Sequence, residues 1–231
     1  MSDALGNRYK AILERMAGAA ARAGRDPASV RLVAVSKTKP AEQVRHAAAA
    51  GAEIFGENYI QEARDKFNAL TDLPLQWHFI GHLQSNKAKF AIRLFDLVHT
   101  VDSVHLALAL NKHAAGVGKV QEILIQVNIS GEATKSGTTE KNVQGLIEST
   151  LEMPNLKVRG LMTLPPFFDA PEKARPFFAG LRMLRDRLQA AFGDKVNLKE
   201  LSMGMTGDFE VAIEEGATLV RIGTALFGER P

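Results

Sequence analysis

The chain has 231 residues, with 29 Lys and Arg against 26 Asp and Glu, which leaves a formal net charge of +3. A hydrophobic fraction of 45% and a charged fraction of 24% are typical of a globular protein and exclude a disordered chain. The small positive surplus contains no basic run, so we expect no nucleic-acid partner. Cysteine is absent, which excludes disulfides, thiolate metal sites and cysteine nucleophiles.

The sequence also indicates the cellular compartment of the protein. No apolar stretch reaches the length of a membrane span, and the N-terminus carries charges where a signal peptide has an apolar core. The absence of cysteine fits a reducing compartment. We therefore expect a cytoplasmic protein without a membrane partner.

Apolar side chains recur at helical spacing over the first residues, up to a Gly and a Pro that end the pattern, and predict a helix over residues 1–24. Short apolar runs then alternate with amphipathic segments. The runs predict strands at residues 31–36, 53–57, 76–80, 97–101, 122–128, 157–162, 198–203 and 219–223. The segments between them predict helices at residues 41–50, 59–70, 85–94, 103–115, 140–151, from 169 onward, and at 208–215.

Three of these helices have a side chain suited to cap the first turn. Ser85 precedes one helix, and Asp102 or Ser103 precedes the next. Asp169 precedes the long helix, with Glu172 three residues later. The apolar stripe that we expect on this long helix consists of Phe177, Leu181, Leu184 and Leu188.

Eight strands, each followed by a helix or by a final helical stub, imply parallel pairing with right-handed crossovers. Eight such units in this length predict an α/β fold of the (β/α)8 TIM-barrel type, with the N-terminal helix packed on the barrel. A doubly wound sheet is the alternative, but the SKTKP sequence at residues 36–40 lacks the glycine fingerprint that often follows strand one there. No linker interrupts the chain, so we expect one domain over residues 1–231.

In such a barrel, functional groups lie at the carboxyl ends of the strands. Lys37 ends strand one, on the face that it shares with Val33 and Val35. We expect this face to point inward, which would desolvate the Lys37 amine and make it a nucleophile toward carbonyl groups. The alternative is a solvated lysine, which is what we expect for Lys39.

The loops after strands seven and eight bind phosphate in many barrels. Here both loops hold small and hydroxyl residues before a short helix, an arrangement that favours anions, although tight turns alone would also explain it. The residues are Ser202, Gly204, Thr206, Gly207, Gly223 and Thr224. On strand eight the alternation turns Arg221 inward, where it needs an ion pair with a carboxylate such as Glu57 or an acceptor atom on a ligand.

Other chemistry finds less support. His78 and His82 lack a third ligand at metal-binding spacing, so we expect no metal site. A GxSxG motif for a nucleophilic serine is absent. A lysine amine, a phosphate cradle and an inward arginine together describe a site for a phosphorylated aldehyde. Two chemistries fit: a lysine aldolase acting on a sugar phosphate, and a pyridoxal phosphate site.

Several segments resemble the pyridoxal phosphate homeostasis proteins (the YggS/PROSC family), in order along nearly the whole chain. They are AVSKTKP at residues 34–40, FGENYIQEA at 55–63, WHFIGHLQSNK at 77–87, RGLMT at 159–163 and LSMGMTGDFEVAIEEGATLVRIGTALFG at 201–228. The resemblance implies a barrel similar to that of alanine racemases. It also implies that Lys37 holds pyridoxal 5′-phosphate as an internal aldimine, and that the protein acts in vitamin B6 and amino-acid homeostasis.

The resemblance further implies which residues bind the cofactor. Arg221 maps to the arginine that faces the pyridine nitrogen, and Asn58 to the asparagine of the GEN motif. The phosphate contacts map to Ser202, Gly204, Thr206, Gly223 and Thr224. The family is not associated with robust turnover, so no catalytic residue is implied.

The residues themselves also predict little catalysis. A two-base racemase needs a second acid or base opposite the lysine, which alanine racemases take from an added domain that we do not expect here. The tyrosines of this chain are Tyr9, in the N-terminal helix, and Tyr59, after strand two. An arginine beside the pyridine nitrogen would also disfavour its protonation.

Three alternatives stay open: an enzyme with weak racemase or decarboxylase activity, a cofactor-free aldolase, and an interaction module. We expect a monomer, with apo-enzymes that require pyridoxal phosphate as candidate partners.

Overall fold

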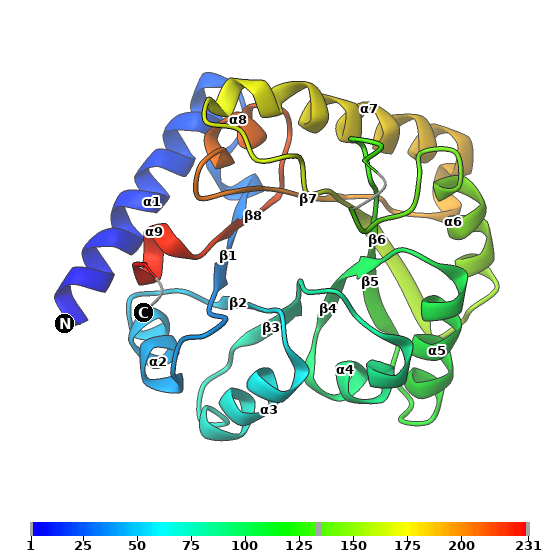
Figure 1. Cartoon of the computed structure of the whole chain (residues 1–231), viewed down its shortest axis with the longest axis horizontal. Helices are drawn as coiled ribbons and strands as arrows, with labels where there is room; N and C mark the ends of the chain where they lie inside the picture. The colour runs from blue at the N-terminus through cyan, green and yellow to red at the C-terminus, as the bar shows by residue number, and fades with distance from the viewer. Residues whose placement is uncertain (1, 133–134, 230–231) are drawn as a thin grey trace.

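The computed structural model describes residues 2–132 and 135–229. Within these residues, eight parallel strands close into a barrel in sequence order, with the first strand paired to the last (Figure 1). The strands are β1 (Arg31–Val35), β2 (Ile54–Glu57), β3 (Gln76–Phe79), β4 (Leu97–Val101), β5 (Gln121–Gln126), β6 (Leu156–Met162), β7 (Glu200–Met205) and β8 (Leu219–Ile222). The predicted (β/α)8 barrel is confirmed, and the doubly wound sheet is excluded.

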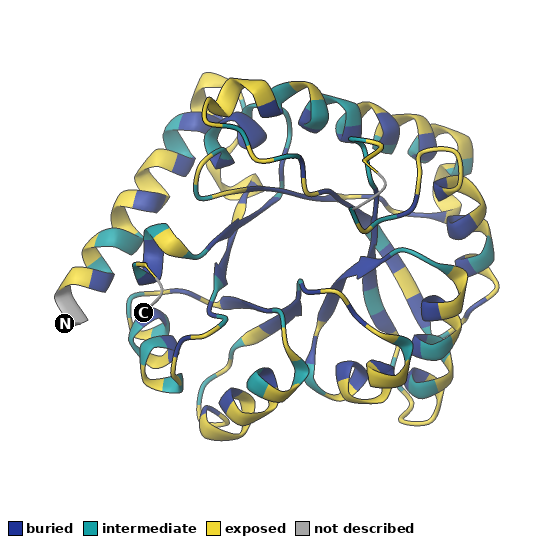
Figure 2. Cartoon of the chain, viewed as in Figure 1, coloured by how far each residue is buried: buried dark blue, intermediate teal, exposed yellow. Residues whose placement is uncertain are grey.

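Helices surround the barrel, with their exposed faces outward and the strands buried inside them (Figure 2). The helices are α1 (Ser2–Arg22), α2 (Ala41–Ala49), α3 (Ile60–Ala69), α4 (Ala88–Leu94), α5 (Val104–Ala115), α6 (Val143–Leu151), α7 (Arg175–Phe192), α8 (Phe209–Glu214) and α9 (Thr224–Phe227). In the described ranges they are accompanied by four 3-10 turns: η1 (Pro27–Ser29), η2 (Ser85–Lys87), η3 (Pro171–Ala174) and η4 (Gly193–Lys195). Within the described part of the chain, no helix combines the length and apolarity that a bilayer crossing requires.

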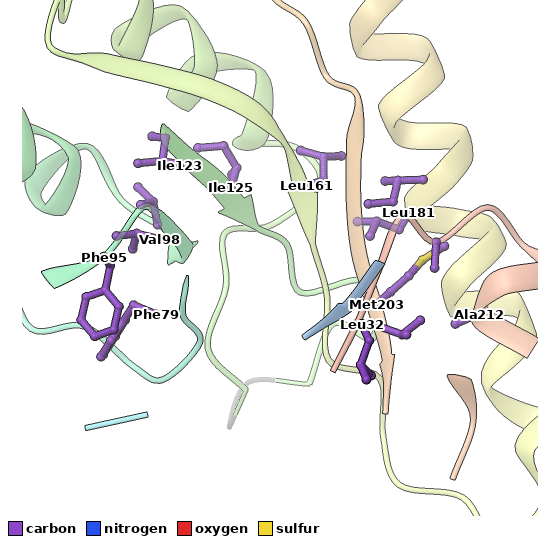
Figure 3. Packing of buried hydrophobic residues seen from close by; sticks show 14 of the residues in the cluster. Leu32, Phe79, Phe95, Val98, Ile123, Ile125, Leu161, Leu181, Met203 and Ala212 are labelled. Carbon is purple, nitrogen blue, oxygen red and sulfur yellow. The ribbon is translucent and has the colours of Figure 1, made fainter. Parts of the chain in front are cut away.

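The core has two layers, because alternate side chains of each strand face opposite sides. The layer inside the barrel consists of Val33, Ile54, Leu97, Leu124, Met162 and Leu219. The larger layer lies between strands and helices and includes Leu32, Val98 and Leu181 (Figure 3). Since Val33 faces inward while Leu32 faces the helices, the predicted orientation of β1 is confirmed.

The N-terminal helix α1 lies against α2, α8 and α9 (Figure 1). Its buried face consists of Leu5, Ile12, Met16, Ala19 and Ala20. Arg8 Nε donates to the Leu226 carbonyl at 2.7 Å, and Arg15 forms a surface ion pair with Glu210 at 3.1 Å. Exposed pairs contribute little, so apolar burial is the main force that holds α1 on the barrel.

The predicted caps are only partly correct. The Ser103 hydroxyl caps α5 as expected. Ser85 does not cap a helix; its Oγ lies 3.0 Å from His105 Nε2 instead. Asp169 is also not a cap, because the chain enters the 3-10 turn η3 after Ala170 without a side-chain hydrogen bond. Residue type alone does not show which contact a serine or aspartate makes.

Two further expectations were wrong in register. Phe178, and not Phe177, belongs to the buried stripe of α7, while Phe177 is half-buried and stacks on Phe168 with ring centroids 5.7 Å apart. Two adjacent phenylalanines fit the helical period equally well, so spacing could not separate them. Strand β7 extends from Glu200 to Met205, so both of its ends lie two residues later than predicted.

Candidate functional site

A cavity of about 450 Å³ opens at the carboxyl ends of the strands, where the loops after β1, β2, β6, β7 and β8 meet. Its volume lies in the range of small-molecule sites, roughly 300 to 1,000 Å³. Six of the eight residues predicted to bind the cofactor line it: Lys37, Asn58, Thr206, Arg221, Gly223 and Thr224. Another cavity of about 450 Å³ beside α3 and α4 shares Asn58 but contains neither Lys37 nor Arg221.

Lys37 lies two residues beyond the end of β1 at Val35 and is partly buried on the wall of this cavity. The expectation of a solvated Lys39 was wrong. Its side chain is buried, and its Nζ donates to the Glu229 carbonyl at 2.9 Å. The turn closed by the Lys39 N–H on the Ser36 carbonyl, at 3.0 Å, reverses the chain and directs the two lysines to different places. Of the two, only Lys37 lines the cavity.

Arg221 extends from β8 into the barrel and is 3% exposed. Its Nη1 donates to Ser202 Oγ at 2.6 Å, and its Nη2 donates to the Thr163 carbonyl at 3.0 Å. Burial lowers the pKa of Arg221 to about 10, against the opposing effect of the Asp208 carboxylate. The guanidinium is therefore still a cation at neutral pH, on the floor of the cavity.

The ion pair between Arg221 and Glu57, which the sequence left open, does not form. Glu57 Oε1 lies 2.6 Å from Lys66 Nζ instead. Among the residues that the structure describes, no carboxylate is within ion-pair distance of Arg221. This arrangement favours the other alternative, in which the arginine faces an acceptor atom on a ligand.

A buried hydrogen-bonded chain continues from Arg221 across the barrel. Ser202 Oγ lies 2.9 Å from His99 Nδ1, and His99 Nε2 lies 3.0 Å from His78 Nδ1. Arg221 already donates to Ser202 Oγ, and this hydroxyl also lies within hydrogen-bond distance of His99 Nδ1, so we assign the hydroxyl proton to His99 Nδ1 and the Nε2–H of His99 to His78. Burial lowers the pKa of both histidines, to about 3 for His78. Both imidazoles are neutral at pH 7, and the chain orients the arginine.

Ser202 and Gly204, which were grouped with the phosphate loop, do not line the cavity. They belong to β7, which extends further than predicted. Ser202 is fully buried and acts on the cavity only through Arg221. Gly204 has a φ of +90°, and a Cβ there would lie 2.5 Å from the Ala212 Cβ, so glycine allows α8 to pack on β7.

The loops after β7 and β8 nevertheless form one wall of the cavity. Thr206 Oγ1 accepts the Ala225 N–H at 3.4 Å, which joins the two loops. Asp208 also lines the wall, but its Oδ1 accepts the Met205 N–H at 2.6 Å, and burial raises the pKa of this carboxyl group. The Asp208 carboxyl group is thus engaged by the backbone, while the Thr206 and Thr224 hydroxyls border the cavity.

Sequence reasoning missed the opposite wall. The loop after β6 contributes apolar side chains to the cavity, and Phe167 on this loop is 89% exposed at its edge. The lining residues of this loop and of η3 are Leu164, Pro166, Phe167, Phe168, Pro171 and Ala174. The available signal was the LPPFF sequence at residues 164–168, shortly after a strand end, because prolines stiffen a loop and apolar residues there are unusual.

The two histidines considered as metal ligands differ in their burial. His78 is buried inside the barrel, whereas His82 is exposed. In the described residues, no three His, Asp or Glu side chains come together in a way that could hold a metal ion.

Comparison with known proteins agrees with this geometry. The alanine racemase N-terminal domain family matches residues 8–231. A pyridoxal phosphate homeostasis protein from Aquifex aeolicus is 50% identical over 223 residues, covering 96% of this chain and 97% of the relative. The chain belongs to the family of pyridoxal phosphate homeostasis proteins. The resemblance inferred from the sequence motifs is confirmed.

Solved structures support the same family. PipY of Synechococcus elongatus, solved with PLP bound, has a TM-score of 0.83 and 40% identity, covering 94% of this chain and 100% of that one. Alanine racemase from Corynebacterium glutamicum has a TM-score of 0.73 at 20% identity, and the match covers 62% of its length. The second likeness shows the shared barrel fold.

Proposed function

We propose that this protein binds pyridoxal 5′-phosphate in the barrel cavity and serves vitamin B6 homeostasis as a holder of the cofactor. One observation carries the proposal: a lysine, a buried arginine and two threonines from three separate segments border the same cavity. The PLP-bound relative PipY supports it. The absence of cysteine supports the cytoplasm as the proposed location.

The chemistry of the cavity fits this cofactor. A phosphate ester needs hydroxyl and backbone donors, and Thr206, Gly223 and Thr224 border one end. A pyridine ring needs an apolar wall, which the loop after β6 provides. When bound, pyridoxal phosphate supplies an aldehyde carbon that a lysine amine can attack. We assign Lys37 as that amine, Arg221 as the donor to the ring nitrogen, and Asn58 as a further cofactor contact.

Ser202 and Gly204 keep a role in this proposal, but a supporting one. Ser202 accepts a hydrogen bond from Arg221, and Gly204 allows α8, the helix that follows the Thr206 loop, to pack on β7. The contacts to phosphate then rest on Thr206, Gly223 and Thr224.

We further propose that turnover is weak or absent. The titratable side chains among the described residues that line the cavity are Lys37, Asp208 and Arg221. Asp208 is engaged by the backbone, and Tyr9, whose hydroxyl donates to the Gly51 carbonyl at 2.8 Å, lies on α1 outside the cavity. Racemisation needs a second acid or base opposite the lysine. Supply of the cofactor to apo-enzymes, by a monomeric carrier, fits this set of residues better than catalysis.

Replacement of Thr224 by valine tests the phosphate end of the cavity. The variant keeps the shape of the side chain but removes a hydroxyl, so we expect the affinity for pyridoxal phosphate to fall by about 1–3 kcal/mol. The wild-type protein should bind pyridoxal, which lacks the phosphate, far more weakly than pyridoxal phosphate. The wild type and the Thr224→Val variant should bind pyridoxal with equal affinity. Titration calorimetry measures all four affinities. Equal affinity of the unchanged protein for pyridoxal and its phosphate would contradict the placement of the phosphate.

A further inference from the structure

A buried polar cluster lies directly behind the turn that carries Lys37, between the ends of β1 and β2 and the helix α3. Glu57 is fully buried, Lys66 is 5% exposed, and the two form an ion pair at 2.6 Å. Neither residue lines the cavity. A buried ion pair costs much desolvation energy and is weak evidence for stability, so its presence beside Lys37 needs another explanation.

The ammonium group of Lys66 holds the peptide group before Lys37. An ammonium has three N–H donors. Those of Lys66 reach the Ser36 carbonyl at 2.5 Å, Glu57 Oε1 at 2.6 Å and Glu62 Oε1 at 2.8 Å. The Ser36 hydroxyl also donates to Glu57 Oε1, at 2.6 Å. The residue that precedes Lys37 is therefore held through both its backbone and its side chain.

The residue after Lys37 is held by the same cluster. Thr38 has a φ of +65°, in the left-handed region that β-branched residues rarely adopt, and it is the one such non-glycine residue in the described chain. Its N–H donates to Glu62 Oε1, the same oxygen that accepts from Lys66. Strained backbone persists where surrounding contacts hold it, often beside functional groups.

We propose that Glu62 is a positioning residue for Lys37. With Lys66 and Glu57 it fixes the peptide groups on both sides of Lys37, which sets the direction of the Cα–Cβ bond and keeps the amine on the cavity wall. This inference rests on the proposed function, in which Lys37 attacks the aldehyde of the cofactor. A lysine side chain is long and flexible. The orientation of its backbone and Cα–Cβ bond therefore decides how often the amine meets the aldehyde carbon.

Two ligands separate positioning from general support. Pyridoxal 5′-phosphate can form an imine, whereas pyridoxine 5′-phosphate carries an alcohol in place of the aldehyde and cannot. For Glu62→Ala we expect affinity for pyridoxal 5′-phosphate to fall about tenfold, because misplacement of a reacting group is costly. Affinity for pyridoxine 5′-phosphate should stay within about twofold, since the cavity itself is unchanged.

Three further variants make the test specific. Glu62→Gln keeps an oxygen that can accept the Thr38 N–H and should retain most of the affinity. Asp65→Ala removes the same charge from an exposed position of α3 and should have no effect. Thr38→Gly removes the strain, because glycine adopts positive φ freely, and should restore much of the loss when combined with Glu62→Ala.

The outcomes distinguish this inference from the proposed function. Unchanged binding of both ligands by Glu62→Ala, with the imine absorbance of the unchanged protein intact, would overturn the positioning role alone. Equal loss of both ligands would assign Glu62 a purely structural role and would also overturn it. If the wild-type protein develops no imine absorbance with pyridoxal 5′-phosphate, the proposed function is overturned, and this inference with it.

Discussion

Replacement of Gly81 by alanine is expected to destabilise the barrel by about 4 kcal/mol or more, the range of severe core substitutions. Gly81 follows β3, and a Cβ at this position would lie 2.2 Å from the carbonyl oxygen of Asn58 and 2.7 Å from its Cα. These are backbone atoms, so the strain cannot be relieved by rotation of a side chain. The loop that carries Asn58 into the cavity would have to move.

Chemical denaturation measures this loss, and Gly145 offers a matched control. Gly145 lies within α6, and a Cβ there would meet nothing within 4 Å. Gly145→Ala should raise the free energy of unfolding by about 0.5–1 kcal/mol, because alanine is the better helix former. If Gly81→Ala were as stable as the unchanged protein, the close approach of the β3 end to Asn58 would be wrong.

Acid should destabilise the protein through the buried histidines. Burial lowers the pKa of His78 to about 3 in the folded state, whereas the ordinary pKa of a histidine side chain is 6.5. As the pH falls below 6.5, His78 binds a proton in the unfolded chain but not in the folded chain. Below pH 6.5, His78 therefore lowers the free energy of unfolding by about 1.4 kcal/mol per pH unit, until the pH reaches about 3. Above pH 6.5 both states are neutral and the contribution is constant.

His78→Asn isolates this effect, because the asparagine amide oxygen can replace Nδ1 as the acceptor for His99 but does not titrate. We expect a shallower fall in the free energy of unfolding between pH 6.5 and 4 for this variant. His82→Asn, at an exposed position, should follow the unchanged protein. Denaturant unfolding across this pH range checks both. Parallel curves for all three proteins would mean that His78 titrates normally in the folded state.

The sequence predicts the barrel well, because its signals are local. Each strand is a short apolar run, each helix has a 3.6-residue period, and parallel connections have one favoured hand. The inward face of β1 follows from alternation, so Val33 and Lys37 could be placed before the structure was known. Errors occur where two residues fit one local pattern, as with Phe177 and Phe178.

The site was predicted only in part, because several of its contacts join distant segments. Nothing local to Lys66 shows that it contacts Glu57 and the Ser36 carbonyl. Nothing local to His99 shows that its ring lies beside Ser202. Asn58 was predicted as a cofactor contact from the family resemblance and not from its own chemistry.

The identity of the cofactor-linked lysine tests the central claim most directly. The protein is incubated with pyridoxal 5′-phosphate, reduced with borohydride and digested, and the labelled peptide is sequenced by mass spectrometry. We predict a label on Lys37, its loss in Lys37→Ala, and full labelling in Lys39→Ala, because the Lys39 ammonium is held by the Glu229 carbonyl away from the cavity. A label mainly on Lys39 or Lys87, or labelling that persists in Lys37→Ala, would contradict the assignment.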